Sequence, residues 1–319
     1  MNSLITFSPA YTLVPTYECF NKCHYCNFRR DLGKAPWLSL EQAHQILEKL
    51  QSQGICEILI LSGEVHPNSP QRSAWFQRVY DLCQLAMALD FLPHTNVGPL
   101  SFEEMARLKL VNASMGLMLE QLSPTLEKTV HRSAPSKIPQ LRLQQLEWAG
   151  ELKIPFTTGL LLGIGETEAE CDQALGAIAD VHQQWGHIQE VILQPYRPGN
   201  QESLAQHGFD LSQLPSVVAR ARKHLPEDVA IQVPPNLIDQ PNILLACLDA
   251  GARDLGGIGI KDEVNPSYPH PQIKALSQIL KPAGWKLHPR LPVYSHYFNQ
   301  LSPPLLAIAQ KWQTRLLSL

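Results

Sequence analysis

The sequence predicts an α/β protein folded as a closed (β/α)8 barrel, in which eight parallel strands alternate with helices. Two observations support this fold class. Short apolar runs rich in β-forming residues alternate with longer amphipathic segments along most of the chain, an order typical of parallel sheets. No Gly/Ser-rich linker or charge run marks a domain boundary, which favours one large barrel over two ordinary domains.

Eight strands are predicted from these runs. The first, residues 11–17, ends directly at a loop that contains three cysteines. The others are residues 57–61, 91–94, 113–119, 156–162, 187–193, 229–233 and 254–258. The active site of such a barrel lies at the C-terminal ends of the strands, so the polar residues found there are the candidates for function.

Helical patterns fill the gaps between the strands. Ser39 is a good N-cap for the helix after the cysteine loop, Gln42 completes a capping box, and Gly54 ends the helix. Residues 140–152 and 168–184 are also predicted to be helical. We expect the barrel to span residues 1–283. Residues 284–319, with a last amphipathic helix at 305–317, are expected to pack on it as a cap.

Composition limits the class of protein. The chain has 319 residues, 44% of them hydrophobic, and a formal charge of −3. A near-neutral balance gives no reason to expect binding to nucleic acid or to an anionic membrane surface. There is no charged-then-apolar leader and no apolar run of spanning length. The four cysteines outside the loop sit in apolar contexts, so a cytoplasmic protein with reduced thiols is expected.

Cys19, Cys23 and Cys26 form a C-x3-C-x2-C motif within one short loop. Thiolates are the usual ligands of iron–sulfur clusters, and a four-iron cluster normally takes four of them. Three thiolates would leave one iron open to bind a small molecule. An electron-transfer protein would be expected to offer a fourth. A structural zinc site, with His24 as fourth ligand, is the other alternative, but His24 lies between two of the thiols, where one ion could hardly use all four groups.

With an aromatic residue, Tyr25, directly before the last cysteine, the motif resembles the signature of radical S-adenosylmethionine (SAM) enzymes. The resemblance implies a 4Fe-4S cluster whose open iron binds the amino and carboxylate groups of SAM. An electron from the cluster would then cleave SAM to methionine and a 5'-deoxyadenosyl radical. Tyr25 would lie near the adenine, although an ordinary packed aromatic residue is the alternative.

The segment Ser62-Gly63-Glu64 follows the second predicted strand. Gly63 would allow close approach of the backbone to a ligand, and Glu64 can pair with an ammonium group. Radical SAM enzymes have a Gly-Gly-Glu-like element here that binds the methionine amine, and Ser62 replaces its first glycine.

Further candidates for binding SAM follow later strands. Glu120 ends the fourth strand, and ribose hydroxyls are its plausible partners. Arg132 offers a guanidinium fork that suits the SAM carboxylate. Gly163 and Ile164, after the fifth strand, would lie against the adenine according to the resemblance.

Five longer segments carry a narrower resemblance. They are Leu-Pro-His-Thr-Asn at 92–96, Asn-Ala-Ser-Met-Gly-Leu-Met-Leu-Glu at 112–120, and residues 131–137, 154–159 and 186–192. Together they resemble subunit 1 of the 7,8-didemethyl-8-hydroxy-5-deazariboflavin (FO) synthase family over roughly residues 11–270. Departures are Pro195-Tyr196 in place of Asn-Phe, and Leu255 where a tryptophan is usual. Asn112 and Ser114, within the segment 112–120, are expected to help bind the cofactor.

This resemblance implies the second half-reaction of deazaflavin (coenzyme F420 chromophore) synthesis. A partner subunit, FO synthase subunit 2, would join a tyrosine-derived hydroxybenzyl group to a ribitylaminouracil. This chain would abstract hydrogen from the adduct, and ring closure with loss of ammonia would give FO. A low-potential donor such as ferredoxin or flavodoxin would supply electrons. Biotin synthase or a menaquinone-pathway enzyme would share the cysteines and Glu64, but not the longer segments.

Ammonia loss and aromatisation require proton transfers, for which a base of near-neutral pKa is best suited. His94 and His66, which follow predicted strands, and Asp254 are the candidates. Substrate-binding residues are expected at the strand ends, and the candidates are Thr95, Asn96, Gln194, Arg197, Gly256 and Gly257.

Overall fold

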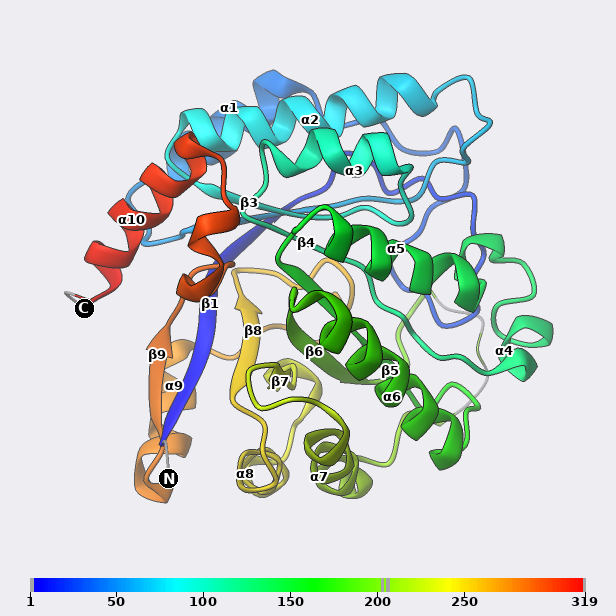
Figure 1. Ribbon diagram of the computed structural model, residues 1–319, viewed down its shortest axis with the longest axis vertical. Coiled ribbons are helices and arrows are strands. Elements are labelled where there is room, and N and C mark those ends of the chain that lie inside the picture. The colour runs from blue at the N-terminus through cyan, green and yellow to red at the C-terminus, as the bar shows by residue number, and fades with distance from the viewer. Residues whose placement is uncertain (1–2, 202–203, 205–206, 318–319) are drawn as a thin grey trace.

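The computed structural model describes residues 3–201, 204 and 207–317. It confirms the predicted barrel (Figure 1). Strands β1 to β8 are parallel neighbours in sequence order, and β1 pairs with both β8 and β2, which closes the sheet. Within the described ranges, no helix is long and apolar enough to cross a membrane.

The strands agree with the prediction to different degrees. Their bounds are β1 Leu4–Leu13, β2 Glu57–Leu61, β3 Leu92–Asn96, β4 Ser114–Gly116, β5 Phe156–Leu162, β6 Ile188–Pro195, β7 Ala230–Gln232 and β8 Asp254–Ile258. The second, fifth and eighth were predicted to the residue. The third, sixth and seventh differ by one or two residues at each end, and the fourth is shorter than expected.

The prediction for the first strand was wrong. It begins at Leu4 and ends at Leu13, before most of the predicted segment. Pro9 lies within this strand, although proline cannot donate to a ladder and is rare in central strands. Its carbonyl still accepts a hydrogen bond from Cys56 N at 3.0 Å, and Pro9 pairs with Ile258 of β8. The sheet therefore tolerates this proline.

Helices surround the barrel (Figure 1). Their bounds are α1 Leu40–Leu50, α2 Arg72–Ala88, α3 Phe102–Lys109, α4 Pro124–Lys128, α5 Pro139–Glu151, α6 Glu168–Trp185, α7 Leu214–His224, α8 Pro241–Asp249, α9 Ile273–Leu280 and α10 Pro303–Leu317. Short 3-10 turns are η1 Pro135–Lys137, η2 Leu211–Gln213, η3 Pro235–Leu237, η4 Lys281–Ala283 and η5 Ser295–Gln300. The capping box between Ser39 and Gln42 is present, as expected.

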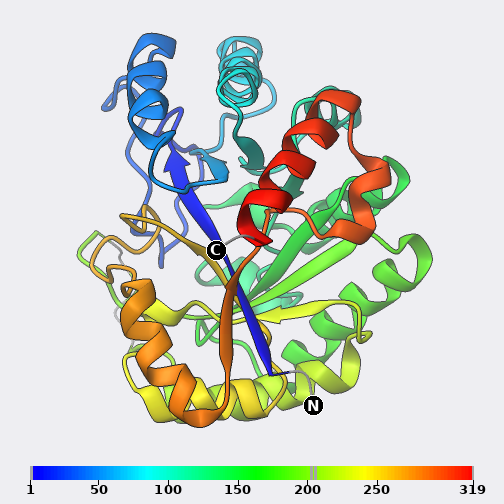
Figure 2. The same ribbon diagram turned by 90° about the vertical axis from the view of Figure 1, so that its left-hand side faces the viewer.

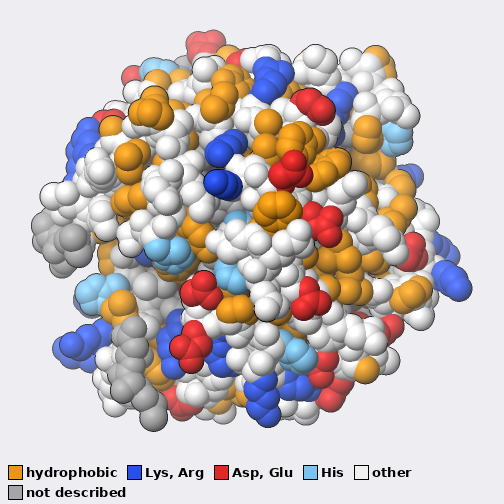
Figure 3. Space-filling view, viewed as in Figure 1, with side chains coloured by type: hydrophobic (Ala, Val, Ile, Leu, Met, Phe, Trp, Pro, Cys, Tyr) orange, Lys and Arg blue, Asp and Glu red, His pale blue; other side chains and the backbone are white. Residues whose placement is uncertain are grey.

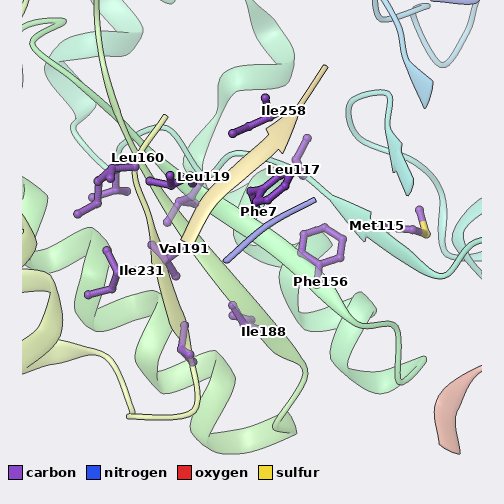
Figure 4. Packing of buried hydrophobic residues seen from close by; sticks show 14 of the residues in the cluster. Phe7, Met115, Leu117, Leu119, Phe156, Leu160, Ile188, Val191, Ile231 and Ile258 are labelled. Atoms are coloured by element: carbon purple, nitrogen blue, oxygen red, sulfur yellow. The ribbon is translucent and has the colours of Figure 1, made fainter. Parts of the chain in front are cut away.

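The core lies between the barrel and its helices. Figure 4 shows side chains from several strands packed together, among them Phe7, Phe156, Val191 and Ile258. Strand β5 is buried along its whole length, as expected for a parallel strand covered on both faces. This packing holds the strand ends rigidly and so fixes the positions of the polar residues that follow them.

The C-terminal extension closes the N-terminal end of the barrel. A ninth strand, β9 Lys286–Pro289, pairs with the first half of β1, and the two lie side by side in Figure 2. Strand β9 was not predicted from the sequence, since it has only four residues and ends in proline. Beyond it, Leu305 and Trp312 pack against Cys56 and Leu92, beside the first residues of β2 and β3.

The surface carries charges of both signs. In the view of Figure 3, basic and acidic side chains are interspersed, with small apolar areas between them. This mixed distribution on the visible face agrees with the near-neutral formal charge.

Candidate active site

Two connected hollows lie at the C-terminal end and inside the barrel. The first, here called the thiol pocket, has a volume of about 310 Å³ and is lined by Cys19, Cys23 and Cys26. The second, here called the lumen cavity, has a volume of about 180 Å³ and extends down inside the barrel to Arg290. Residues that line both hollows include Asn96, Met118 and Gln194. A molecule bound in one hollow is therefore next to a molecule bound in the other.

The cysteine loop is anchored by its backbone. Cys19 N donates to Arg30 O at 3.2 Å, which joins the two ends of the loop. Lys22 N donates to Ser133 O at 2.8 Å, and His24 N donates to Val130 O at 3.1 Å. These bonds hold the loop against residues 130–133 and turn all three thiols toward the pocket. His24 does not line the thiol pocket.

The donor set fits a 4Fe-4S cluster with one open iron. The three motif thiols are partly exposed to the pocket, whereas the other four cysteines are buried elsewhere. Burial raises the pKa of the Cys19 thiol to about 11 and that of Cys23 to about 12, so binding of iron must displace their protons. Over the described ranges, no three or more His, Cys, Asp or Glu side chains are arranged around a single metal ion.

Glu64 faces the thiols and is held by two partners. Asn21 Nδ2 donates a hydrogen bond to its Oε2 at 2.9 Å, and Arg142 Nη2 lies 3.4 Å from its Oε1. A Cβ atom at Gly98, which has a φ of 86°, would lie 2.4 Å from Glu64 Cγ. Only glycine leaves room for the carboxylate there. Ser62 and Gly63 also line the pocket, in agreement with the expected ligand-binding element.

Glu120 and Lys137 form a buried ion pair in the wall of the thiol pocket. Burial tends to raise the pKa of Glu120, but Lys137 and Arg142 outweigh it and hold that pKa below its ordinary value. Glu120 has a φ of 65°, a left-handed conformation that non-glycine residues seldom adopt. Such strain is concentrated at functional sites, where surrounding structure holds it.

Tyr25 lines the thiol pocket, and its hydroxyl lies 3.0 Å from His131 Nε2. Gly163 and Ile164 lie behind it rather than in the pocket wall. Their backbone N–H groups both donate to the carboxylate of Glu166, at 2.6 and 2.9 Å. Ile164 is buried in the same apolar cluster that Tyr25 packs against. These two residues support the pocket wall instead of presenting free donors to it.

His94 lies in the lower part of the lumen cavity. Its Nδ1 is 2.7 Å from Ser114 Oγ, and the Ser114 hydroxyl donates to Pro292 O at 2.6 Å. Because the Ser114 hydroxyl proton is donated to Pro292 O, His94 Nδ1 must donate the hydrogen bond to Ser114 Oγ. The lone pair of the neutral imidazole is then on Nε2. Ser114 thus positions His94 at the floor of the cavity and not at the barrel mouth, where its place at the end of a predicted strand led us to expect it.

Several candidates for binding substrate do line the hollows. Asn96 and Gln194 line both of them, and Gly257 lines the lumen cavity. Arg197 reaches the edge of the thiol pocket, where it pairs with Asp239 at 2.9 Å. Gly256 is buried, and a Cβ atom at this position would lie 2.3 Å from Gln232 Nε2. Gly256 is therefore a packing residue.

Strand alternation corrects two expectations. His94 and Asn96 face the interior of the barrel, so Thr95 between them faces outward. Its hydroxyl donates to Asn112 Oδ1 at 2.5 Å. The amide of Asn112 donates in turn to Leu108 O at 3.0 Å. Both residues join strands to outer helices and reach neither hollow.

Two other candidates lie outside the site. His66 is exposed and lines a separate pocket on the outer side of the barrel, where its ring packs on Phe20 at 5.1 Å. The loop after β2 turns away from the mouth at that point. Arg132 is exposed and is absent from the thiol pocket wall. The basic residues in that wall are Lys137 and Arg142, along with Arg29 and Arg197 at its edge.

Asp254 lies at the opposite end of its strand from the mouth. It is the first residue of β8 and has no exposed surface. Arg290 holds it with two hydrogen bonds, Nε to Oδ2 at 2.6 Å and Nη2 to Oδ1 at 2.8 Å. Gly256 N and Thr6 Oγ1 donate to the same carboxylate, at 2.7 and 2.5 Å. With its oxygens satisfied, Asp254 anchors Arg290 instead of acting on a substrate.

Several polar residues of the site were not predicted from the sequence. Asn21, Lys137 and Arg142 line the thiol pocket, and Glu57 and Glu190 lie at the floor of the lumen cavity with Arg290. Glu57 and Glu190 carried a signal that could have been used. Each is a carboxylate inside a predicted strand, and a charge in a buried strand needs a specific reason. Nothing local marked Arg142, which lies within a helix.

Comparison with known proteins agrees with this geometry. A model of the radical SAM superfamily matches residues 13–178. The [FeFe]-hydrogenase maturase HydG from Carboxydothermus hydrogenoformans has a similar structure, with a TM-score of 0.75. That match covers 99% of this chain and 79% of HydG at 17% identity, and it supports the fold alone. The barrel, the three-thiol loop and the family match define a radical SAM enzyme, a class whose members use a 4Fe-4S cluster and SAM.

Relatives with higher sequence identity show which family of radical SAM enzymes the chain belongs to. The chain is 64% identical over 310 residues to 7,8-didemethyl-8-hydroxy-5-deazariboflavin synthase from Trichormus variabilis, covering 97% of this chain and 91% of that protein. It is 60% identical to the protein of the same name from Trichodesmium erythraeum, covering 99% of each. The chain belongs to the 7,8-didemethyl-8-hydroxy-5-deazariboflavin (FO) synthase family, as its sequence segments indicated.

Proposed function

We propose that this protein makes FO from the adduct of a hydroxybenzyl group and a ribitylaminouracil, with SAM as co-substrate. The reaction would release 5'-deoxyadenosine, methionine and ammonia, which makes the enzyme a carbon–nitrogen lyase. The observation that carries this proposal is the continuity of the thiol pocket with the lumen cavity. SAM held beside the thiols would have its reactive carbon facing a substrate inside the barrel.

The wall of the thiol pocket offers charges of the right signs for SAM. The cluster, held by Cys19, Cys23 and Cys26, would supply the electron that cleaves SAM. Glu64, oriented by Asn21, can accept hydrogen bonds from the ammonium group of the methionine part. Lys137 is the candidate for binding the carboxylate of the methionine part of SAM. Glu120 can accept hydrogen bonds from the ribose hydroxyls of SAM.

The lumen cavity suits a large polar substrate whose radical must be protected. Asn96, Gln194 and Gln232 offer amides to the heterocycle and the ribityl chain. The chain that follows β9 seals the floor, because Pro292 O accepts hydrogen bonds from Ser114 Oγ and from Gln189 Nε2, the latter at 2.8 Å. A closed floor excludes water and limits side reactions of a carbon radical.

Two partners complete the proposed activity. FO synthase subunit 2 would supply the adduct, and a low-potential protein such as ferredoxin or flavodoxin would reduce the cluster. The cysteine loop lies at the surface end of the barrel, and Lys22 and Lys34 within and beside it are exposed. An acidic electron donor could therefore approach the cluster from this side.

The test is an anaerobic assay of the reconstituted protein with SAM, reductant, tyrosine, the ribitylaminouracil and the partner subunit. Fluorescent FO, formed in step with 5'-deoxyadenosine and ammonia, is the expected result. The partner subunit alone and the Cys23→Ala variant serve as controls. Cleavage of SAM without any FO, when the adduct is demonstrably present, would contradict the proposed substrate.

A further inference from the structure

We propose that Glu190 is a catalytic residue of the FO-forming reaction, in which it takes a proton from the substrate at the floor of the lumen cavity. This inference rests on the proposed function and adds to it the proton-transfer group. It comes from the position of Glu190 in the barrel and from the charges that surround it.

Glu190 faces the interior of the barrel. It lies on β6, where Glu190, Ile192 and Gln194 alternate inward and all line the lumen cavity. Gln194 also lines the thiol pocket. Four residues of strand separate Gln194 from Glu190, a rise of roughly 13 Å at 3.3 Å per residue. A substrate that extends from the thiol pocket to the floor would therefore reach Glu190.

The carboxylate of Glu190 is only partly satisfied by the protein. The residue is 4% exposed. Thr157 Oγ1 donates to its Oε2 at 3.0 Å, whereas its Oε1 has no well-aligned hydrogen bond. Arg290 forms an ion pair with Oε1, but its guanidinium is already directed at Asp254. A buried oxygen without an aligned donor, in a cavity wall, is available to a ligand.

The charges around Glu190 do not balance. Asp254 from β8, Glu57 from β2 and Glu190 itself meet one buried cation, Arg290, while His94 from β3 carries no charge because its pKa is lowered to about 3 by burial and by Arg290. Three carboxylates and one guanidinium would leave two negative charges in the barrel, at a high desolvation cost. Retention of a proton by one carboxyl group relieves that cost.

Glu190 is the carboxyl group best placed to exchange that proton. The oxygens of Asp254 already accept two hydrogen bonds from Arg290 and one each from Gly256 N and Thr6 Oγ1. Burial raises the pKa of Glu190 to about 7, since the neighbouring Asp254 and Glu57 add to it and Arg290 only partly opposes it. A group that titrates near neutral pH can both accept and return a proton. His94, with its low pKa, is a poor base and can instead accept a hydrogen bond through Nε2.

The proposed step balances without an added oxidant or reductant. The Glu190 carboxylate takes a proton from the carbon next to the one that bears the amine. The electrons of that C–H bond become the new double bond, and the C–N electron pair leaves with the nitrogen. Glu190 returns the proton to that nitrogen as the bond breaks, so that the neutral amine departs as ammonia.

The first test separates the radical step from the proton step in the reconstituted enzyme supplied with adduct by the partner subunit. In Glu190→Gln we expect 5'-deoxyadenosine formation within twofold of wild type and FO formation at least 100-fold lower. In single turnovers, the wild-type rate of FO formation should rise with pH through about 7. The matched variant Glu57→Gln should keep a rise but show it at lower pH, because it removes a negative charge that raises the pKa of Glu190. Equal losses of FO and 5'-deoxyadenosine in Glu190→Gln would mean that Glu190 only positions the substrate, and would overturn the proposal.

The second test needs no activity and so remains decisive if the proposed function fails. Infrared difference spectra of the metal-free protein between pH 6 and pH 8 should show the band of a protonated, buried carboxyl group disappearing. Glu190→Gln should remove this band, and Glu57→Gln should retain it with its loss moved to lower pH, because a neighbouring negative charge is gone. The reverse result would assign the proton to Glu57 and refute the inference. If Glu190→Gln does not fold, Glu190→Asp should keep a shifted band and still lose more FO than 5'-deoxyadenosine.

Discussion

The side-chain amide of Asn21 donates a hydrogen bond to Glu64 Oε2 at 2.9 Å. Asn21 lies between two of the three motif thiols, and Glu64 follows β2, so this bond joins the cysteine loop to the barrel. The same amide donates to Ser136 Oγ at 2.8 Å, and Asn21 Oδ1 accepts from Ser136 N at 3.2 Å. One buried side chain therefore fixes the loop relative to two walls of the thiol pocket.

Removing this amide should destabilise the protein and weaken SAM binding together. Asn21→Leu removes one of the two partners of Glu64 and both hydrogen bonds between Asn21 and Ser136, which costs about 1–3 kcal/mol in the free energy of unfolding. Chemical denaturation and SAM titration measure the two effects. Asn68→Ala, at an exposed position, is the control and should change stability by less than about 0.5 kcal/mol. An unchanged SAM affinity in Asn21→Leu would show that Glu64 does not need this support.

The cluster should depend on three cysteines only. Cys19→Ala, Cys23→Ala or Cys26→Ala should each abolish cluster binding and SAM cleavage, because two thiolates cannot hold four irons. Iron content and brown absorbance after reconstitution measure this. Alanine at Cys56, Cys83, Cys171 or Cys247 should leave the iron content intact, since all four are buried away from the pocket. Full iron content in any motif variant would refute the assignment of ligands.

SAM affinity should distinguish Glu64 from Arg132. Glu64→Gln removes a charge-assisted hydrogen bond to the SAM ammonium and should weaken binding by about 1–3 kcal/mol, measured by calorimetry on the reconstituted protein. Arg132→Ala should leave the affinity unchanged, because this side chain is exposed and lies outside the pocket wall. A large effect of Arg132→Ala with none of Glu64→Gln would reverse our placement of the methionine part.

The C-terminal extension should stabilise the barrel through a buried cation. Arg290→Met leaves Asp254 and Glu190 without their counter-ion, so we expect a loss of about 3–5 kcal/mol in the free energy of unfolding. Lys311→Met, which breaks the exposed ion pair with Asp90, should cost at most about 1 kcal/mol. Similar losses in the two variants would show that the barrel floor tolerates an unpaired carboxylate.

Stability should fall in acid partly because of His94. Burial lowers the pKa of His94 to about 3 in the folded protein, against 6.5 for an ordinary histidine. Between those values the unfolded chain binds a proton that the folded chain does not, so the free energy of unfolding decreases as pH falls. One such group contributes a slope of about 1.4 kcal/mol per pH unit. Denaturation of wild type and His94→Asn between pH 6.5 and pH 4.5 should show the smaller slope in the variant. Parallel slopes would mean that His94 titrates normally.

The sequence by itself determined the class of fold and the chemistry of the cluster. Alternating apolar and amphipathic segments are local patterns, and they located seven of the eight barrel strands, whereas the predicted first strand shares only residues 11–13 with the observed one. The thiol motif is also local, because three ligands for one group must lie close together and here occupy a single loop. The sequence segments around Glu64 and Glu120 placed both carboxylates at strand ends, and both do line the thiol pocket.

Only the tertiary structure decided which charges face one another. Arg142 reaches Glu64 from a helix 78 positions along the chain, and Arg290 reaches Asp254 from the C-terminal extension. Such pairs depend on how the barrel closes and on which side of each strand a residue faces. The same closure turned Thr95 outward, left Arg132 in solvent and brought Glu190 to the cavity floor. A local sequence pattern can identify a candidate residue. Its charge and its role depend on burial and on partners that are distant in the sequence.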